Sequence, residues 1–182
     1  MFPFSLRGGK FSCIASSFGN DFERALLSLN TGDEVAIKAG RRLLSPVGAM
    51  CDNPIRRITL ICSSAMAIAP SLQVLQTLDD GNISLEKINF IWINDNSDEF
   101  ICNDAVLELY KAHKDKLEVH RFVTSSLDDF ATFEADEFLS AVDRYEPGSV
   151  ALLCGPPAAN QVMKLLLSRY SYTAENLLSI EL

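Results

Sequence analysis

The sequence predicts an α/β fold in which a parallel sheet carries helices on both faces and follows a small β-rich segment. From Ile58 onward, apolar stretches typical of strands alternate with stretches at helical spacing. The strand-like stretches are almost continuously apolar, as expected when both faces of a strand are buried. Before this point the chain shows short strand-like stretches and one helix. We therefore divide the chain near Pro54, into residues 1–53 and 54–182.

Composition limits the classes of function. The chain has 182 residues, of which 48% are hydrophobic, which is enough for one compact domain with a core. Its net charge of −8 argues against binding to nucleic acid or to anionic membranes. No apolar run approaches the roughly 20 residues of a membrane-spanning helix. The five cysteines lack zinc-site spacing and indicate free thiols in a reducing compartment, either mitochondrial or cytoplasmic.

The N-terminal segment contains three predicted elements. "KFSCIAS" is typical of a strand, "DFERALLSL" of a short helix that begins at Asp21, and "DEVAIKAG" of a half-exposed strand. Residues 1–20 contain Arg7 and Lys10 but no acidic residue, a bias shared by mitochondrial presequences. We favour a strand here over a cleaved presequence, and targeting stays open.

The second segment contains the predicted parallel sheet. Four strands are expected at about 58–63, 88–94, 117–124 and 149–154, with a last strand in "LLSIEL". Helices are expected at about 71–78, 103–113 and 134–143, and over "PAANQVMKLLLSRY". The turn at 63–67 and Gly155 should then share the C-terminal edge of the sheet, where open α/β sheets bind ligands.

One of these stretches carries a resemblance to a known family. "LLCGPPAANQVMKLLL" resembles the C-terminal signature of the ferredoxin–NADP reductase superfamily, and the branch it is most similar to is NADH:cytochrome b5 reductase. "LNTGDEVAIKAG", "ICSSAMAIAPSLQVLQTL" and "FIWINDNSDEF" follow the family's order, so the resemblance covers most of residues 29–182. It implies a Rossmann-like NAD(P)-binding domain over 54–182 and a truncated flavin-barrel-like segment over 1–53.

The resemblance also implies a reaction and a set of site residues. In this family a hydride passes from NAD(P)H to FAD, and single electrons then pass to an acceptor. The Cys-Gly-Pro-Pro turn lies near the nicotinamide, which makes Cys154 the candidate catalytic residue. Gly155 would let the backbone approach the cofactor, and Pro156 and Pro157 would stiffen the turn at the start of the helix.

The family's glycine-rich phosphate loop is altered in this chain. When the sequences are aligned through Pro70, the family glycines fall on Ser64, Ala65 and Ala67, and its threonine falls on Met66. The serine and the two alanines are small enough for the turn to form, but they crowd the approach of a phosphate and exclude left-handed backbone conformations at a cost of roughly 1 kcal/mol each. We therefore expect weakened dinucleotide binding. A turn that only packs is the alternative, and both stay open.

The end of the second strand bears on cofactor choice. Asn94 and Asp95 are candidate cofactor-binding residues, and the strand end "INDNSDE" offers Asp95, Asp98 and Glu99 but no Arg or Lys. An acidic group there favours a free ribose hydroxyl over a 2′-phosphate. NADH is therefore expected in preference to NADPH.

The flavin half of the family is incomplete in this sequence. The Arg-x-Tyr-Ser/Thr stretch that holds flavin is absent, so FAD is expected only if a partner completes the barrel. Five aromatic residues gather in this segment and predict contacts with other protein subunits through residues 1–50, unless they pack onto the second domain: Phe2, Phe4, Phe11, Phe18 and Phe22.

Three functions follow from these observations. The first is the NAD(P)H-binding module of a cytochrome b5 reductase-like oxidoreductase. The second is a catalytically degenerate relative that serves as a structural subunit of a larger complex, for which a mitochondrial location stays open. The third is a nucleotide-binding α/β domain of unrelated function. No metal site is predicted, because His113 and His120 have no ligand partners at metal-binding spacing.

Overall fold

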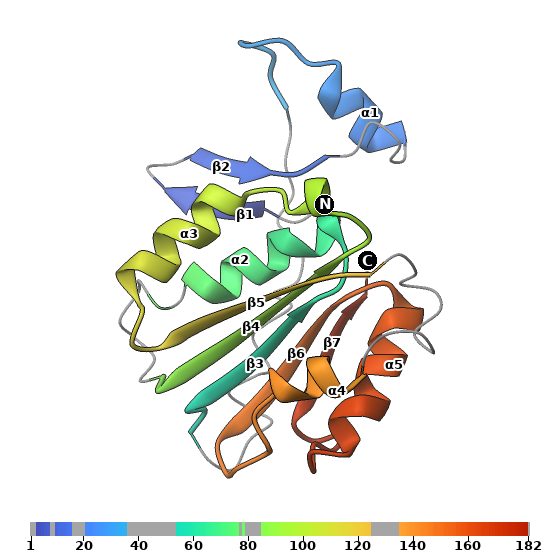
Figure 1. Ribbon diagram of the computed structural model, residues 1–182. Coiled ribbons are helices and arrows are strands. Elements are labelled where there is room, and N and C mark those ends of the chain that lie inside the picture. The colour runs from blue at the N-terminus through green and yellow to red at the C-terminus, as the bar shows by residue number, and fades with distance from the viewer. Residues whose placement is uncertain are drawn as a thin grey trace.

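A five-stranded parallel sheet forms the centre of the protein, with strand order β5-β4-β3-β6-β7 (Figure 1). The computed structural model describes residues 3–7, 10–15, 21–35, 54–76, 78, 85–124 and 135–181. The strands of the sheet are β3 (Arg57–Cys62), β4 (Lys87–Asn94), β5 (Leu117–Val123), β6 (Ser149–Gly155) and β7 (Leu177–Glu181). The predicted α/β fold and its five strands are confirmed.

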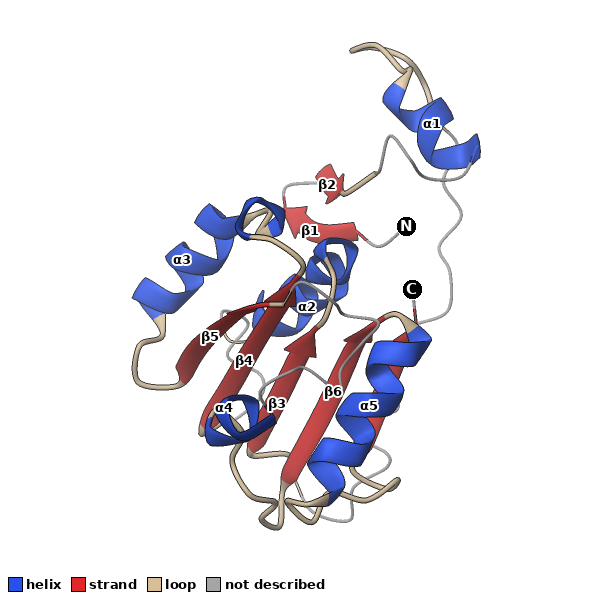
Figure 2. Ribbon diagram, turned by 45° about the vertical axis from the view of Figure 1, so that its right-hand side comes forward, coloured by secondary structure: helices blue, strands red, loops and turns tan. Residues whose placement is uncertain are grey.

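Helices cover both faces of the sheet (Figure 2). One face carries α2 (Ile68–Gln76) and α3 (Asn103–Ala112), and the other carries α4 (Ala135–Ser140) and α5 (Pro157–Ser168). Neighbouring strand residues serve opposite faces, so Leu60 packs in the core on the α2 side and Ile61 in the core on the α5 side. Burial on both faces explains why these strands are apolar throughout.

The chain reverses direction across the sheet between β3 and β6. From β3 it continues outward through β4 to β5, and it then returns to build β6 and β7 on the other side of β3. Helix α2 follows β3 and helix α5 follows β6, on opposite faces. In open α/β sheets this switch point, at the C-terminal ends of the strands, is where ligands bind.

Two helices differ from their predicted bounds. Helix α2 begins at Ile68, directly after the 3₁₀ turn η1 (Ala65–Ala67), rather than near residue 71. Pro70 is tolerated there because the first-turn amides of a helix have no intrahelical acceptor. The helix predicted over 134–143 ends at Ser140, where Ala141 donates to the Phe138 carbonyl over 3.0 Å in a tighter turn.

The N-terminal segment contains an antiparallel hairpin of β1 (Pro3–Arg7) and β2 (Lys10–Cys13), followed by α1 (Asp21–Leu27). Strand β2 and helix α1 confirm two of the predicted elements, whereas β1 was not predicted. The hairpin lies beside α2 (Figure 1). Within the described residues of this segment, these two strands do not close a barrel.

Some predictions for the N-terminal segment concern residues or side chains that the structure does not describe. The stretch "DEVAIKAG" is described only over 33–35, and those three residues form no strand. Phe2 and Phe18, and the side chains of Phe4, Phe11 and Phe22, lie outside what the structure describes. The domain boundary near Pro54 stays a prediction. In the described ranges, no helix has the length and apolar character needed to span a bilayer.

Candidate functional site

The C-terminal ends of β3 and β6 are fastened together at the switch point. The Ser63 amide donates to the Cys154 carbonyl over 2.9 Å, and the Ser63 hydroxyl lies 3.4 Å from the same oxygen. Ser63 is fully buried, and a Cβ atom on Gly155 would lie only 1.9 Å from its hydroxyl oxygen. A side chain at position 155 would therefore require Ser63 to shift. The predicted meeting of the 63–67 turn and Gly155 at one sheet edge is confirmed.

The 63–67 turn forms without glycine. Ser64 is extended, with φ −169°, and its hydroxyl accepts from the Ala67 amide over 3.3 Å. The same amide also donates to the Ser64 carbonyl over 3.1 Å, and the Ile68 amide donates to the Ala65 carbonyl. Among the described non-glycine residues, positive φ angles occur only elsewhere, at Cys102 and Ser171. The turn needs no left-handed residue, and its own Ser64 oxygens occupy the Ala67 amide that a phosphate would otherwise approach.

The predicted cofactor-binding residues of this turn differ in accessibility. Ser64, Ala65 and Met66 are half-buried, whereas Ala67 and Pro70 are buried. A ligand at the crevice would therefore meet the first three side chains, while the last two pack beneath the turn.

The Cys-Gly-Pro-Pro turn leads directly into α5. Pro156 precedes the helix and is half-buried, and Pro157 is its first residue and is exposed. Asn160, one turn further, is buried and donates to the Gly155 carbonyl over 3.1 Å and to the Ile180 carbonyl over 3.3 Å. Sequence reasoning missed Asn160. Its signal is a lone amide on the buried side of an otherwise apolar helix, where a polar group needs hydrogen-bond partners.

Cys154 faces Cys62 across the β3–β6 pair, and both thiols are fully buried. Burial raises the pKa of the Cys154 thiol to about 12, and the Ser71 hydroxyl beside it acts weakly in the opposite direction. Burial and the neighbouring Cys154 also raise the pKa of Cys62 well above its ordinary range. Cys154 thus lies under the candidate site as a neutral thiol, and neutral thiols are poor nucleophiles.

The end of β4 forms the other side of the candidate site. Asn94 is fully buried, and its carbonyl accepts from the Thr124 amide over 3.0 Å. Asp95 and Asp98 are exposed in the turn that follows, where Asn96 caps the 3₁₀ turn η2 (Ser97–Glu99). An exposed carboxylate at this strand end suits a ribose hydroxyl.

A cation from the next strand lies near this strand end and escaped sequence reasoning. Arg121 of β5 pairs in register with Trp92, and its guanidinium lies 5.5 Å from the centroid of the Trp92 ring. It also lies 5.8 Å from the Phe100 ring centroid and hydrogen-bonds to the Asn103 side chain at the start of α3. Parallel pairing over a separation of 29 residues brings Arg121 here, and "INDNSDE" itself contains no sign of it.

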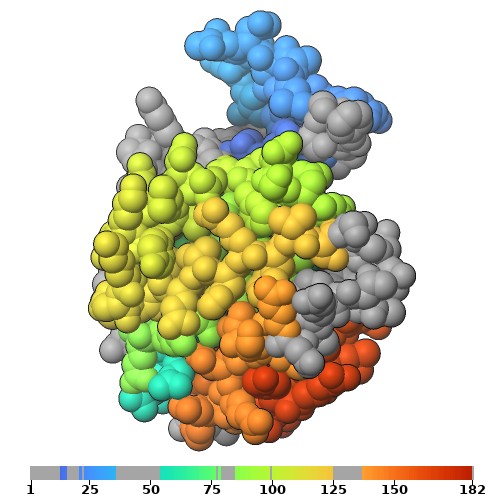
Figure 3. Space-filling view, viewed as in Figure 1, coloured from blue at the N-terminus to red at the C-terminus, as the bar shows by residue number. Residues whose placement is uncertain are grey.

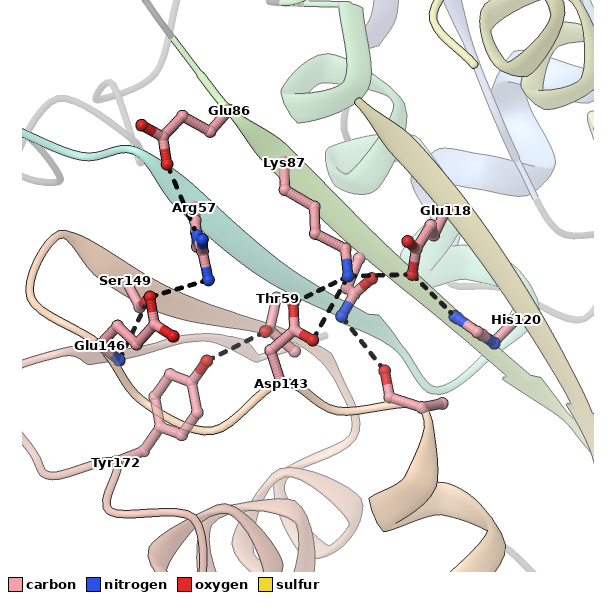
Figure 4. Close-up of polar contacts among 12 residues, drawn as sticks. Arg57, Thr59, Glu86, Lys87, Glu118, His120, Asp143, Glu146, Ser149 and Tyr172 are labelled. Carbon is pink, nitrogen blue, oxygen red and sulfur yellow. Dashed lines mark hydrogen bonds and ion pairs between the residues drawn. The ribbon is translucent and has the colours of Figure 1, made fainter. Parts of the chain in front are cut away.

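A group of polar side chains gathers at the opposite end of the sheet, on the α4 and α5 face (Figure 4). Lys87 bridges Asp143 at 3.0 Å and Glu118 at 3.1 Å. Arg57 lies 2.9 Å from Glu146. These contacts tie the chain after α4 onto β3, β4 and β5. Because they lie at the N-terminal ends of the strands, away from the crevice, their role is structural.

The described residues bring together no three His, Cys, Asp or Glu side chains that could hold a metal ion. What they do bring together is a pair of strand-to-helix turns at a switch point, with the N-termini of α2 and α5 beside them. That arrangement is the switch point of a Rossmann-like open α/β sheet, the place where such sheets bind ligands.

Comparison with known proteins identifies relatives of this kind. No protein-family profile matches the chain. In sequence it is 24% identical over 155 residues to the NADH nitrate reductase of Ulva prolifera, covering 76% of this chain and 17% of that enzyme. The cytochrome b5 reductase domain of the same enzyme superposes with a TM-score of 0.66 at 20% identity, over 89% of this chain and 64% of that domain.

Two further structures share the fold. The CS-b5R domains of human Ncb5or, in the NAD⁺ form, give a TM-score of 0.63 at 17% identity, over 93% of this chain and 48% of that one. A ferredoxin-NADP⁺ reductase of Plasmodium falciparum with 2′P-AMP gives a TM-score of 0.61 at 14% identity, over 90% of this chain and 66% of that one. Together these relatives confirm the resemblance to the ferredoxin–NADP reductase superfamily and its cytochrome b5 reductase-like branch.

Proposed function

We propose that residues 54–182 form the NAD(P)H-binding module of a cytochrome b5 reductase-like oxidoreductase, with weakened affinity for NADH. The observation that carries this proposal is the Ser63–Cys154 hydrogen bond of 2.9 Å, which holds the two cofactor-side turns together at the switch point. The chain's relatives include an NADH nitrate reductase, which supports the same class of function.

The residues present fit a dinucleotide in part. The N-termini of α2 and α5 offer positive dipole ends to a pyrophosphate, and Gly155 allows close approach of the backbone. Exposed Asp95 would accept from a ribose hydroxyl. The Ala67 amide already donates to the Ser64 hydroxyl, and the side chains of Ser64 and Ala65 crowd the turn. The turn can therefore donate fewer hydrogen bonds to a phosphate. When bound, the dihydronicotinamide supplies a hydride to a flavin, which this chain would meet only with a partner's barrel strands.

The test is a titration of the purified chain with NADH and NADPH, followed by cofactor fluorescence and by calorimetry. We expect saturable NADH binding with Kd on the order of 0.1–1 mM, about −4 to −5.5 kcal/mol. NADPH should bind more weakly, because exposed Asp95 and Asp98 repel a 2′-phosphate. Tighter binding of NADPH would overturn the cofactor preference. Absence of binding of either cofactor at several millimolar would overturn the module itself.

A second candidate is a non-catalytic relative that acts as a structural subunit, in a mitochondrial complex or elsewhere. Two observations favour it. The Ser64 hydroxyl accepts from the Ala67 amide of the same turn, and the Ser63 side chain occupies the space beside Gly155. This candidate predicts protein from the native source that carries no flavin absorption and elutes with other subunits attached. Flavin absorption bands in the blue and near ultraviolet that co-purify with the chain would instead favour the oxidoreductase.

A further inference from the structure

Strand β5 is the last strand on its side of the sheet, and no described strand pairs with its outer edge. The Lys116 carbonyl accepts from the Ile88 amide over 2.7 Å, and the Thr124 amide donates to the Asn94 carbonyl over 3.0 Å. The backbone amides and carbonyls of the even-numbered residues of this strand therefore point toward β4. Backbone groups alternate along a strand, so the odd-numbered residues face outward. The Leu117 amide bonds to the His113 carbonyl over 2.8 Å. The amides of Val119, Arg121 and Val123 have no acceptor among the described residues.

A groove of about 530 Å³ runs along this edge, between β5 and α3. Its floor and walls are largely apolar, and two of its side chains are unusually exposed for their type, Leu107 at 38% and Tyr110 at 39%. Helix α3 and strand β5, both in yellow, lie side by side on the face seen in Figure 3. The described residues that line the groove are Val106, Leu107, Tyr110, Lys114, Leu117, Glu118, Val119, His120 and Arg121.

The groove is cationic on an acidic protein. The whole chain carries a net charge of −8, yet residues 111–121 hold four Lys and Arg side chains against two acidic ones, Asp115 and Glu118, together with both of its histidines. Within the groove, Lys114 and Arg121 are basic, and the one acidic side chain, Glu118, is paired with Lys87 at 3.1 Å. The local charge therefore selects an acidic occupant.

We propose that the α3–β5 groove binds an extended, acidic segment of a partner protein, which adds to the sheet as a strand beside β5. The outward amides of Val119, Arg121 and Val123 would donate to its backbone, and main-chain bonds of this kind carry the affinity of strand addition. Alternate side chains of the segment would enter the groove against Leu107 and Tyr110. A second copy of this chain would instead pair β5 with β5 and make the protein dimerise.

The test uses the full chain and a fluorescent heptapeptide of alternating glutamate and valine, followed by anisotropy at low salt. We expect saturable binding that weakens as salt is raised, and at least about tenfold weaker binding of the matching lysine–valine peptide. Lys114→Glu should lower affinity for the acidic peptide by about tenfold. Lys164→Glu, the same change on α5 at the opposite face, is the matched control and should leave affinity unchanged.

Val119→Pro tests the strand addition directly. Proline is tolerated on an edge strand where its missing amide faces outward, so the fold should persist, and peptide binding should fall about tenfold. In the native chain, bound peptide should slow hydrogen exchange at Val119, Arg121 and Val123. Equal binding of the two peptides, binding without this protection, or concentration-dependent dimerisation through β5 would each overturn the proposal.

Discussion

Ser63 and Gly155 meet at the ends of neighbouring strands with no room for another side-chain atom between them. A Cβ on Gly155 would lie 1.9 Å from the Ser63 hydroxyl oxygen and 3.2 Å from the Ser63 Cβ. Gly155 has an ordinary backbone conformation, since the positive-φ glycines among the described residues are Gly32 and Gly148. The glycine is therefore set by space alone, and its role is to let two strand ends of the candidate site approach each other.

Gly155→Ala should lower the free energy of unfolding by about 1–3 kcal/mol, the usual cost of overpacking a buried position. Ser63→Gly in the same chain should recover most of this loss, because it removes both atoms that clash. Urea denaturation of the two single variants and the double variant measures the coupling. Additive losses would show that the two side chains do not compete for the same space.

Ser64→Gly should strengthen NADH binding by about three- to tenfold. The change removes the half-buried side chain of Ser64 and so clears the approach of a phosphate, while the Ala67 amide keeps its 3.1 Å bond to the carbonyl of residue 64. Its cost to stability should be only a few tenths of a kcal/mol, since glycine is an acceptable N-cap. Ser168→Gly, at the far end of α5, controls for general loosening of a helix. Unchanged NADH affinity in the Ser64 variant would separate this turn from dinucleotide binding.

The buried thiols should make stability fall at high pH. The pKa of Cys154 is raised to about 12 in the folded protein, and that of Cys62 is raised further. Thiols in the unfolded chain ionise near pH 8.5, so the contribution is fully present below that pH and is lost as pH rises toward the folded pKa. Each thiol should cost about 1.4 kcal/mol per pH unit in this range.

The measurement is the free energy of unfolding between pH 8 and 11, compared between the native chain and a Cys62→Ala/Cys154→Ala variant. The variant is destabilised by its cavities, so the comparison is between slopes rather than absolute values. Its curve should be flatter. Parallel curves would mean that both thiols ionise in the folded protein as readily as in the unfolded chain.

The fold followed from the sequence because its strands are buried on both faces. That burial makes β3, β4 and β6 almost continuously apolar, and helices must then cover both sides. The edge strand β5 shows instead an alternation of half-buried and exposed residues. Local patterns of this kind do not depend on which distant segments meet, so they can be recognised from the sequence alone.

The site was only partly predictable, because its decisive contacts join distant segments. The pairing of Ser63 with Gly155 spans 92 residues, and only strand register reveals it. Arg121 was missed for the same reason, since 29 residues separate it from Trp92. The N-cap at Ser64 is different, since a serine before a helix is a local signal. Alignment with the family's glycine pattern emphasised the missing glycines and not the hydrogen bond that the Ser64 hydroxyl accepts.

The last prediction concerns Thr59 and Tyr172, whose hydroxyls lie 3.1 Å apart in the core on the α5 side. Tyr172→Phe should cost about 1–2 kcal/mol, because it leaves the Thr59 hydroxyl buried without its partner. Thr59→Val should cost a similar amount by stranding the tyrosine hydroxyl. The double variant should have nearly the stability of the native chain, because neither hydroxyl then remains buried without a partner. Thermal and urea unfolding of the four proteins gives the coupling energy, and a double variant as unstable as the sum of the singles would mean that water satisfies both hydroxyls separately.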